Sequence, residues 1–386
     1  MKKFVITGLI IIAVGIAAGV CSIAAGVFSS DMWIKAAKHQ NKHLGMLDAP
    51  RKDVWVKPDD APNGLELDIS VKSINIKFVA AAAGSDVTAT VFQRFVKPDH
   101  ESDHITVDYD AASNKLTIKE NNFPDWRRFM YQDLTPMLSW LAPEYKDFDD
   151  VVITYGADTV FGSVSAKTGS GKVEIGNDGK TLNAASVNVT VSSGKVILKG
   201  IEAGSLDVTC NSGNINVSDV KTSGPARIDN ASGNITLTEL ESGKIDIRSS
   251  SGWVGAERVK SADTFNIKSS SGNVRLTKCK ATDFNADVSS GRINADNCAF
   301  IQMNTKTNSG NVIMNALETN NATIHVSSGK ADIQLARGWA SYSLQLTTSS
   351  GAIFVGGSRQ KVGYYSSVVG ADKIVITAHS GRILVS

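Results

Sequence analysis

The sequence contains few residues of the kinds that carry out chemistry. Its 386 residues include six histidines and four cysteines. Two histidines, His39 and His43, are four residues apart, but no third ligand accompanies them, so we interpret them as part of a solvated helical surface. No Gly-x-Ser-x-Gly motif occurs, and "TGSGKV" lacks the first glycine and the final Ser or Thr of a phosphate-binding loop. The sequence therefore predicts no metal, no cofactor and no catalytic centre.

The chain also has little net charge, and that charge is unevenly distributed. The formal charge is +2. Residues 51–162 include 12 basic and 19 acidic residues, whereas residues 163–386 include 23 basic and 17 acidic residues. In the second region basic residues alternate with acidic ones along the sequence instead of forming a cluster. This pattern predicts separate folding units and no nucleic-acid partner.

The longest uncharged run lies at the N-terminus. No residue between Phe4 and Phe28 is charged. At about 1.5 Å of rise per residue, a helix over this run spans a bilayer core of about 30 Å, whereas the apolar region of a cleaved signal peptide is shorter. We therefore predict a transmembrane anchor over residues 1–30, with the short N-terminal tail inside. The expected location is the cell membrane, in a single pass, with the bulk of the chain extracytoplasmic.

Three further regions follow the predicted anchor. Residues 31–64 are expected to form a juxtamembrane helix and a proline-rich linker. Residues 65–162 alternate polar and apolar side chains and predict β-strands, but an aromatic-rich segment at 123–150 predicts a small helical insert. We expect this insert to cap the N-terminal end of the repeats. Residues 163–386 form the repeat region.

The repeat region is defined by a Ser-Gly pair that recurs about every 20 residues. The glycines are Gly171, Gly194, Gly213, Gly233, Gly252, Gly272, Gly291, Gly310, Gly329, Gly351 and Gly381. Counted from each glycine as zero, apolar residues occupy positions −5, +2, +4 and +7 in most repeats. One repeat cannot bury its apolar face without copies above and below it. The predicted fold class is therefore mainly β: a single-stranded parallel β-helix of about eleven coils, with two strands and one Ser-Gly corner per coil.

These repeats resemble the bacterial "putative adhesin" family, a β-strand-repeat domain of unknown function. The units that carry the resemblance are "SSGNVRLTK", "ASGNITLTE" and "SSGKVILKG", together with the first repeat strand, "VSAKTGSGKVEI". The resemblance covers roughly residues 65–386 and brings no catalytic residues. It implies a membrane-anchored β-solenoid, and it connects the chain with adhesion or with envelope-stress systems.

The sequence indicates a non-catalytic structural or interaction module of the bacterial cell envelope. One alternative is a self-assembling β-helical scaffold like the bactofilins, whose ends would lack caps. A more distant alternative is a polysaccharide-active enzyme. Such an enzyme would need carboxylate and arginine clusters on long loops, whereas the coils between Gly194 and Gly329 leave room for only a few loop residues each.

The C-terminal end of the repeats is the expected interaction surface. The last interval between glycines is long, and we expect residues 356–373 to leave the coil and fold across this end. Phe354 and Leu384 are apolar at an outward position, and Tyr364 and Tyr365 lie in the excursion. The excursion can simply cover Phe354 and Leu384 as a cap. Alternatively, this end can dock a partner protein or a second copy of the chain.

The three cysteines of the repeat region have a simpler interpretation. Cys279 and Cys298 both occupy position +7, one coil apart, and Cys210 is also inward. We expect buried free thiols that act as small apolar residues, rather than a disulfide or a metal site.

Overall fold

The computed structural model describes residues 51–93, 105–121, 150–176, 179–361, 363–368 and 370–386. Within these ranges the chain is almost entirely β-strand, and its one helical turn is the 3₁₀ helix η3 (Trp339–Ser341). The prediction of a mainly β fold is therefore confirmed. No helix within the same ranges is long and apolar enough to cross a membrane. The anchor predicted at 1–30 and the juxtamembrane helix predicted within 31–64 lie outside the described residues. So does the helical insert predicted at 123–150, apart from Asp150, which begins a strand.

The described residues form 24 strands that belong to one hydrogen-bonded network. The strands before the regular repeats are β1 (Arg51–Val56), β2 (Glu66–Val71), β3 (Asn75–Ala81), β4 (Thr88–Gln93), β5 (Ile105–Asp110), β6 (Lys115–Glu120), β7 (Asp150–Gly156), β8 (Val160–Phe161), β9 (Ser163–Thr168) and β10 (Lys172–Ile175). The regular repeats contain β11 (Leu182–Ser232), β12 (Ile235–Ser251), β13 (Val254–Glu257), β14 (Lys260–Ser261), β15 (Thr264–Ser271), β16 (Val274–Thr277), β17 (Lys280–Ser290), β18 (Ile293–Asp296), β19 (Ala299–Ser309) and β20 (Val312–Leu335). The last four strands are β21 (Ser343–Val355), β22 (Ser358–Arg359), β23 (Tyr364–Ser367) and β24 (Lys373–Val385).

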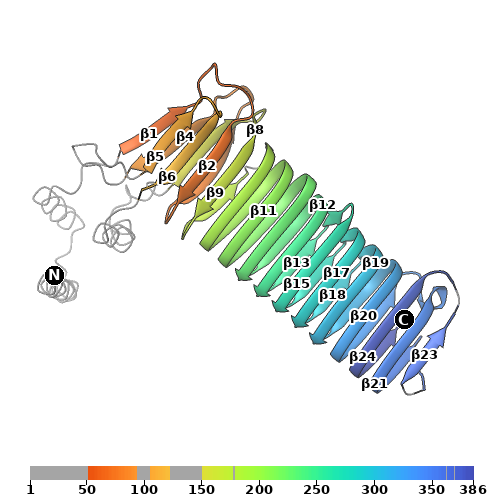
Figure 1. Cartoon of the computed structure of the whole chain (residues 1–386). Coiled ribbons are helices and arrows are strands. Elements are labelled where there is room, and N and C mark those ends of the chain that lie inside the picture. The colour runs from red at the N-terminus through yellow and green to blue at the C-terminus, as the bar shows by residue number, and fades with distance from the viewer. Residues whose placement is uncertain (1–50, 94–104, 122–149, 177–178, 362, 369) are drawn as a thin grey trace, which may run out of the picture. The chain divides into compact units, whose positions relative to one another are not determined.

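Successive repeats stack in parallel register. Ile247 of β12 pairs with Ile267 of β15, which pairs in turn with Ala286 of β17. These two steps advance the sequence by 20 and 19 residues, which is one repeat each. Figure 1 shows the strands of this region side by side, from β9 and β11 through to β20. Each repeat is thus one coil of a continuous parallel stack.

A regular coil has three strand segments, not the two that the sequence predicts. The coil that begins at Gly252 contains β13, the two-residue β14 and β15. The additional bend lies at Arg258, whose φ of 54° is in the left-handed region. The equivalent residues of other coils share this conformation: Gly200, Asp219, Glu239, Lys278, Asn297 and Ala316. The repeat pattern carried a sign of this bend, because strict alternation cannot connect an inward position at +4 with one at +7.

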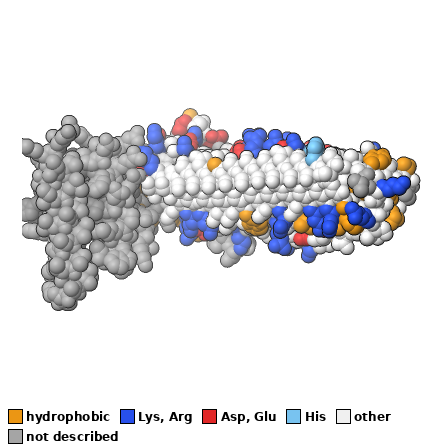
Figure 2. Space-filling view, turned by 90° about the horizontal axis from the view of Figure 1, so that it is seen from below, with side chains coloured by type: hydrophobic (Ala, Val, Ile, Leu, Met, Phe, Trp, Pro, Cys, Tyr) orange, Lys and Arg blue, Asp and Glu red, His pale blue; other side chains and the backbone are white. Residues whose placement is uncertain are grey.

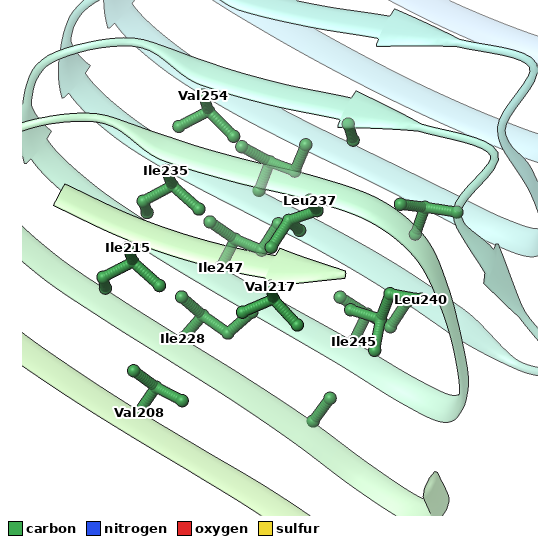
Figure 3. Packing of buried hydrophobic residues seen from close by; sticks show 14 of the residues in the cluster. Val208, Ile215, Val217, Ile228, Ile235, Leu237, Leu240, Ile245, Ile247 and Val254 are labelled. Carbon is green, nitrogen blue, oxygen red and sulfur yellow. The ribbon is translucent and has the colours of Figure 1, made fainter. Parts of the chain in front are cut away.

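The inward rows predicted from the repeats form the core. The residues at −5, +2, +4 and +7 of the regular coils are buried. In Figure 3, Ile215, Ile235 and Val254 come from consecutive coils and lie one behind another in the interior. Phe265 and Phe284 continue such a row with an edge-to-face contact of 5.5 Å between ring centroids. Burial of each large aliphatic side chain contributes about 1.5–3 kcal/mol, so contacts between coils hold the stack together.

The corner glycines approach one another so closely that no side chain fits between them. A Cβ atom on Gly272 would lie 1.8 Å from the carbonyl oxygen of Gly252 in the preceding coil. Gly272 also has a φ of 147°, which residues with a side chain rarely adopt. Where asparagine follows the glycine, its side chain ties the corner to the next coil: Asn234 Oδ1 accepts a hydrogen bond from the backbone N–H of Trp253 at 3.0 Å. The predicted ladder of glycine corners is therefore confirmed, and its main cause is contact between backbones.

The N-terminal end of the stack does not follow the order of the sequence. Strand β2 lies between β6 and β9, and β3 lies between β7 and β10, with all four pairings parallel. The coil formed by β2 and β3 comes first in the sequence but second in space. Outside it, β6 and β7 form the end coil. Antiparallel strands β5 and β4 then pair along β6 and β7, and β1 pairs with β4.

The C-terminal end has the same kind of arrangement. Strand β24 lies between β20 and β21 and is parallel to both. The last strand of the sequence is therefore inside the stack, and β21 forms the end coil. Strands β22 and β23 pair with β21 in the antiparallel direction, so part of the 356–373 excursion does lie along this end. Nothing in the repeat spacing indicates the exchange of order between β21 and β24.

Candidate interaction surfaces

The thiols are structural. In the described part of the chain no cluster of His, Cys, Asp and Glu could hold a metal ion. Cys210, Cys279 and Cys298 are buried and unbridged, as predicted. Contact with the Cys279 thiol, together with burial, raises the pKa of Cys298, and burial raises the pKa of Cys210. A raised pKa leaves little reactive thiolate at Cys210 and Cys298. Cys279, whose pKa is lowered by its contact with the Cys298 thiol, is fully buried, so all three side chains serve as core residues.

The structure brings together only part of the surface predicted at the C-terminal end. Phe354 and Leu384 are half-buried neighbours in parallel register, and the guanidinium of Arg382 lies 5.2 Å from the centre of the Phe354 ring. Tyr364 and Tyr365 pair with the other half of β21, on the far side of its glycine corner. Tyr365 packs against the core, whereas Tyr364 is 56% exposed. The four residues therefore form two separate pairs and not one patch.

Strand β23 is the exposed edge of this end. Its only strand partner in the described part of the chain is β21. Tyr364 and Ser366 are exposed along it, and Val368 follows with 88% exposure. An edge strand of this kind presents unpaired backbone groups, but only four residues belong to it.

The face that carries the corners is continuous along the stack. We define the corner face as the corner glycines from Gly171 to Gly381 with the residues at positions −4, −2, −1, +1 and +3 from each. Serine occupies position −1 in every one of these coils. Figure 2 shows a stripe of white, uncharged atoms that runs lengthwise, as expected for the serines and glycines in the middle of this face, with many Lys and Arg and fewer Asp and Glu side chains along its two sides. The result is a narrow polar strip bordered by cations.

The corner face carries the entire positive excess of the repeat region. It holds ten basic and four acidic side chains, whereas the other positions of residues 163–386 hold thirteen of each. The basic residues are Lys167, Lys172, Lys195, Arg248, Lys268, Arg275, Arg292, Lys306, Lys330 and Arg382, and the acidic ones are Glu174, Asp229, Asp287 and Asp332. Two of the four acids form ion pairs on this face, Lys172 with Glu174 at 2.5 Å and Lys330 with Asp332 at 2.6 Å.

A shallow groove of about 480 Å³ lies on this face across the coils that end at Gly213 to Gly291. Arg248 and Lys268, adjacent in register, line its middle. Asn230, Ser249 and Ser269 also line the groove, although each is at most 4% exposed. Within the described residues, Oδ1 of Asn230 and Oγ of both serines have no hydrogen-bond partner. These three side chains belong to the same inward row as Cys210, at position −3, so their unpaired atoms lie on the core side of the strand.

Acidic side chains lie beside the two central cations of the groove. Asp229 precedes Arg248 in register, and Asp287 follows Lys268. Burial raises the pKa of Asp229, and the charge of Arg248 opposes this shift. The groove therefore combines cations, carboxylates, hydroxyls and an amide, which suits a polar ligand with both anionic and hydroxyl groups.

A second hollow, of about 310 Å³, lies on the strands before the corners and is rich in amides. One of its amides, Asn285, is used within the stack. Nδ2 of Asn285 donates to Oδ1 of Asn266 at 3.0 Å, and Nδ2 of Asn266 donates to Oδ1 of Asp246 at 2.6 Å. This ladder joins neighbouring coils and is a weaker candidate for a binding surface.

Analysis of the sequence missed the corner face as a charged surface. Along the sequence, basic and acidic residues alternate, so no cluster is visible. In the stack, residues about 20 apart become neighbours, as Arg248, Lys268 and Asp287 do. The row at −4 is mixed in sign by itself, and the full positive excess appears only when the rows at +1 and +3 are added to it.

Comparison with known proteins identifies a family. The model of the family described as Toastrack DUF4097 matches residues 65–277 and 254–385. No curated protein matches the chain. Among solved structures, a crystal structure of a "putative cell adhesion protein" from Clostridium sporogenes aligns with 8% identity, covering 87% of this chain and 99% of that chain. Its TM-score is 0.16, so we base no argument on this likeness.

Proposed function

The chain belongs to the Toastrack DUF4097 family, and we propose that it is a membrane-anchored, extracytoplasmic, non-catalytic module that binds a partner through its corner face. The observation that carries the proposal is the corner face itself. It runs without a break along the coils and holds the charge excess of the repeats. A long uninterrupted strip suits contact with an extended partner better than it suits a compact catalytic centre.

The sequence of the N-terminal segment supports the membrane location. The uncharged run from Phe4 to Phe28 is long enough to span a bilayer. A membrane anchor of this kind would keep the stack of coils attached to the membrane. This arrangement agrees with a link to adhesion or to the response to envelope stress, which the family resemblance implies.

Pairing at the two ends supports a single module over a self-assembling scaffold. A β-helix that polymerises end to end needs parallel strand edges that match one another. Here the outer strands β5, β4, β22 and β23 all pair in the antiparallel direction. Such strands interrupt the parallel register that another copy would have to continue.

The location can be tested on the full-length chain. A reporter that is active only outside the cytoplasm, fused after Ser386, should be active, and a reporter that works only in the cytoplasm should be silent. The protein should remain in the membrane fraction after alkaline washing, and deletion of residues 4–28 should release it. Activity of the cytoplasmic reporter alone would contradict the proposal.

A further inference from the structure

We propose that the corner face binds an acidic polysaccharide that lies along the stack of coils. The inference names the partner class for the proposed function, and so rests on it. The partner is defined by its chemistry: a linear polymer of sugars that carries carboxylate, sulfate or phosphate groups at regular intervals.

The distribution of charge indicates that the partner is negatively charged. Ten basic and four acidic side chains lie on the corner face, and the remaining positions of the repeats are balanced. Charge confined to one side of an elongated stack produces a positive potential along that side and attracts anions to it. A polyanion therefore meets this face before any other.

Five cations concentrate the charge within four successive coils. On one side of the row of serines at position −1 lie Arg248, Lys268 and Lys306. On the other side lie Arg275 and Arg292. All five side chains are exposed. Successive coils are about 4.8 Å apart, so a polymer that runs along the strip can contact cations in several coils. Each exposed contact is weak, but contacts made by one chain act together.

The polar groups between the cations indicate a sugar polymer. The strip presents a serine hydroxyl at position −1 of every coil, and Ser250, Ser270 and Ser289 at position −2 line the groove. Hydroxyls can donate to an anion and accept from a sugar hydroxyl. They give the strip hydrogen-bonding capacity along its whole length.

The acidic residues of the face separate this partner from other polyanions. Asp229 and Asp287 flank the two central cations of the groove. They would repel a polyphosphate or a DNA strand, whose repeating units are charged but carry no hydroxyl group that could donate to a carboxylate. A sugar polymer has hydroxyl groups between its anions, and these can donate to the two carboxylates. The face also lacks a continuous aromatic platform for nucleic-acid bases, since its aromatic residues, Trp253 and Phe354, are five coils apart in the sequence.

Binding can be measured with the purified full-length chain in a nonionic detergent. The probes are fluorescently labelled polygalacturonate, which carries carboxylates, and dextran sulfate, which carries sulfates. Neutral dextran, polyphosphate and single-stranded DNA complete the set. We expect saturable binding of at least one acidic polysaccharide, weakened by salt, and no binding of neutral dextran. The comparison of the two acidic polymers identifies the preferred anion.

Two triple variants with the same change in charge locate the binding surface. The test variant combines Arg248→Gln, Lys268→Gln and Lys306→Gln on the corner face. The control combines Lys221→Gln, Lys260→Gln and Lys280→Gln, which lie in one row on another side of the stack. We expect the test variant to weaken binding about tenfold or more and the control to change it less than about threefold. Thermal unfolding of both variants verifies that they remain folded.

Three outcomes would overturn the inference. The wild type could fail to bind either acidic polysaccharide at low salt, or the two triple variants could lose equal affinity. Polyphosphate or DNA could bind more tightly than both acidic polysaccharides, which would make the face a general polyanion surface. None of these results depends on membrane orientation, so a failure of the reporter test and a failure of this inference can be told apart.

Discussion

The middle of the stack and its two ends use the same parallel pairing, but only the middle follows the order of the sequence. Between Gly194 and Gly329 each coil pairs with the coils before and after it in the sequence. At the N-terminal end the coil formed by β2 and β3 sits one place inside, and at the C-terminal end β24 sits one place inside. Both end coils then carry antiparallel strands.

The difference shows how a repeating stack can stop. A parallel stack always leaves an edge that another strand can join. An antiparallel strand covers that edge without offering the register of the next coil. A terminal segment inserted between two coils is hydrogen-bonded on both sides, so it is protected from fraying. The repeated sequence pattern therefore determines strand pairing in the middle of the stack, whereas segments that depart from the pattern determine it at the ends.

Removal of the last strand should have the largest effect. A chain that ends after Asp372 lacks β24, and with it the buried side chains of Ile374, Ile376, Ile383 and Val385. At about 1.5–3 kcal/mol for each, the C-terminal end should lose about 6 kcal/mol or more. Because β24 lies between β20 and β21, the truncation should also detach β21 to β23 and expose them to a protease.

Limited proteolysis followed by mass spectrometry measures this effect. Full-length protein should resist cleavage between Ser343 and Ser367, and the truncated chain should be cut there rapidly. The matched control is Val368→Ser, a change at a residue that is 88% exposed. Equal resistance of the truncated chain and the wild type would mean that the last strand is not an interior element.

A corner glycine in the middle should tolerate substitution much less than a glycine at the end. Gly272→Val places a side chain against the carbonyl oxygen of Gly252 and should destabilise the protein by about 3 kcal/mol or more. Gly357 also has a positive φ, of 80°, but no atom lies within 4 Å of its Cβ position. Gly357→Ala should therefore cost only about 1–2 kcal/mol, from backbone strain.

Urea unfolding of the two glycine variants separates steric conflict from strain. The control is Lys268→Gln, a change to an exposed side chain four residues before Gly272. It should change the free energy of unfolding by less than about 0.5 kcal/mol. If Gly272→Val and Gly357→Ala had equal effects, the close stacking of backbones would not be what requires glycine at the corners.

Features that recur in every coil could be predicted from the sequence, whereas features that depart from the repeat could not. The apolar rows, the buried thiols and the glycine corners all follow from side-chain positions that recur in each coil. The inserted strand β24 could not be predicted, because its pattern fits equally well beside β20, beside β21 or between them. The charged face was present in the sequence but hidden, since Arg248 and Lys268 become neighbours only after the coils stack.

The second bend of the coil, at position +6, is another feature of the middle. A substitution at this bend should make the protein more stable. Ala316 has a φ of 49°, a conformation that costs a residue with a Cβ about 1–2 kcal/mol. Glycine adopts it without strain but loses more entropy on folding. Ala316→Gly should therefore stabilise the protein by about 0.5–1 kcal/mol in urea unfolding. The control Asn315→Gly, next to the bend, should destabilise it, and the same sign for both would argue against strain at Ala316.

The smallest change in stability is expected for a substitution in the row at +7. Burial of this row differs between the middle and the C-terminal end. In the middle this row is buried and holds Val259, Cys279, Cys298 and Leu317, whereas the equivalent residue of the next coil, Ala336, is exposed. Because valine already fills this position in a neighbouring coil, Cys279→Val should change stability by less than about 1 kcal/mol.

The same burial should keep the thiols of Cys279 and Cys298 from reacting with an alkylating reagent in the native protein. Labelling before and after denaturation, followed by mass spectrometry of the peptides that contain Cys279 and Cys298, should therefore show modification of both only after unfolding. Rapid labelling of the native chain would mean that the middle of the stack opens locally, and the comparison with the ends would then lose its basis.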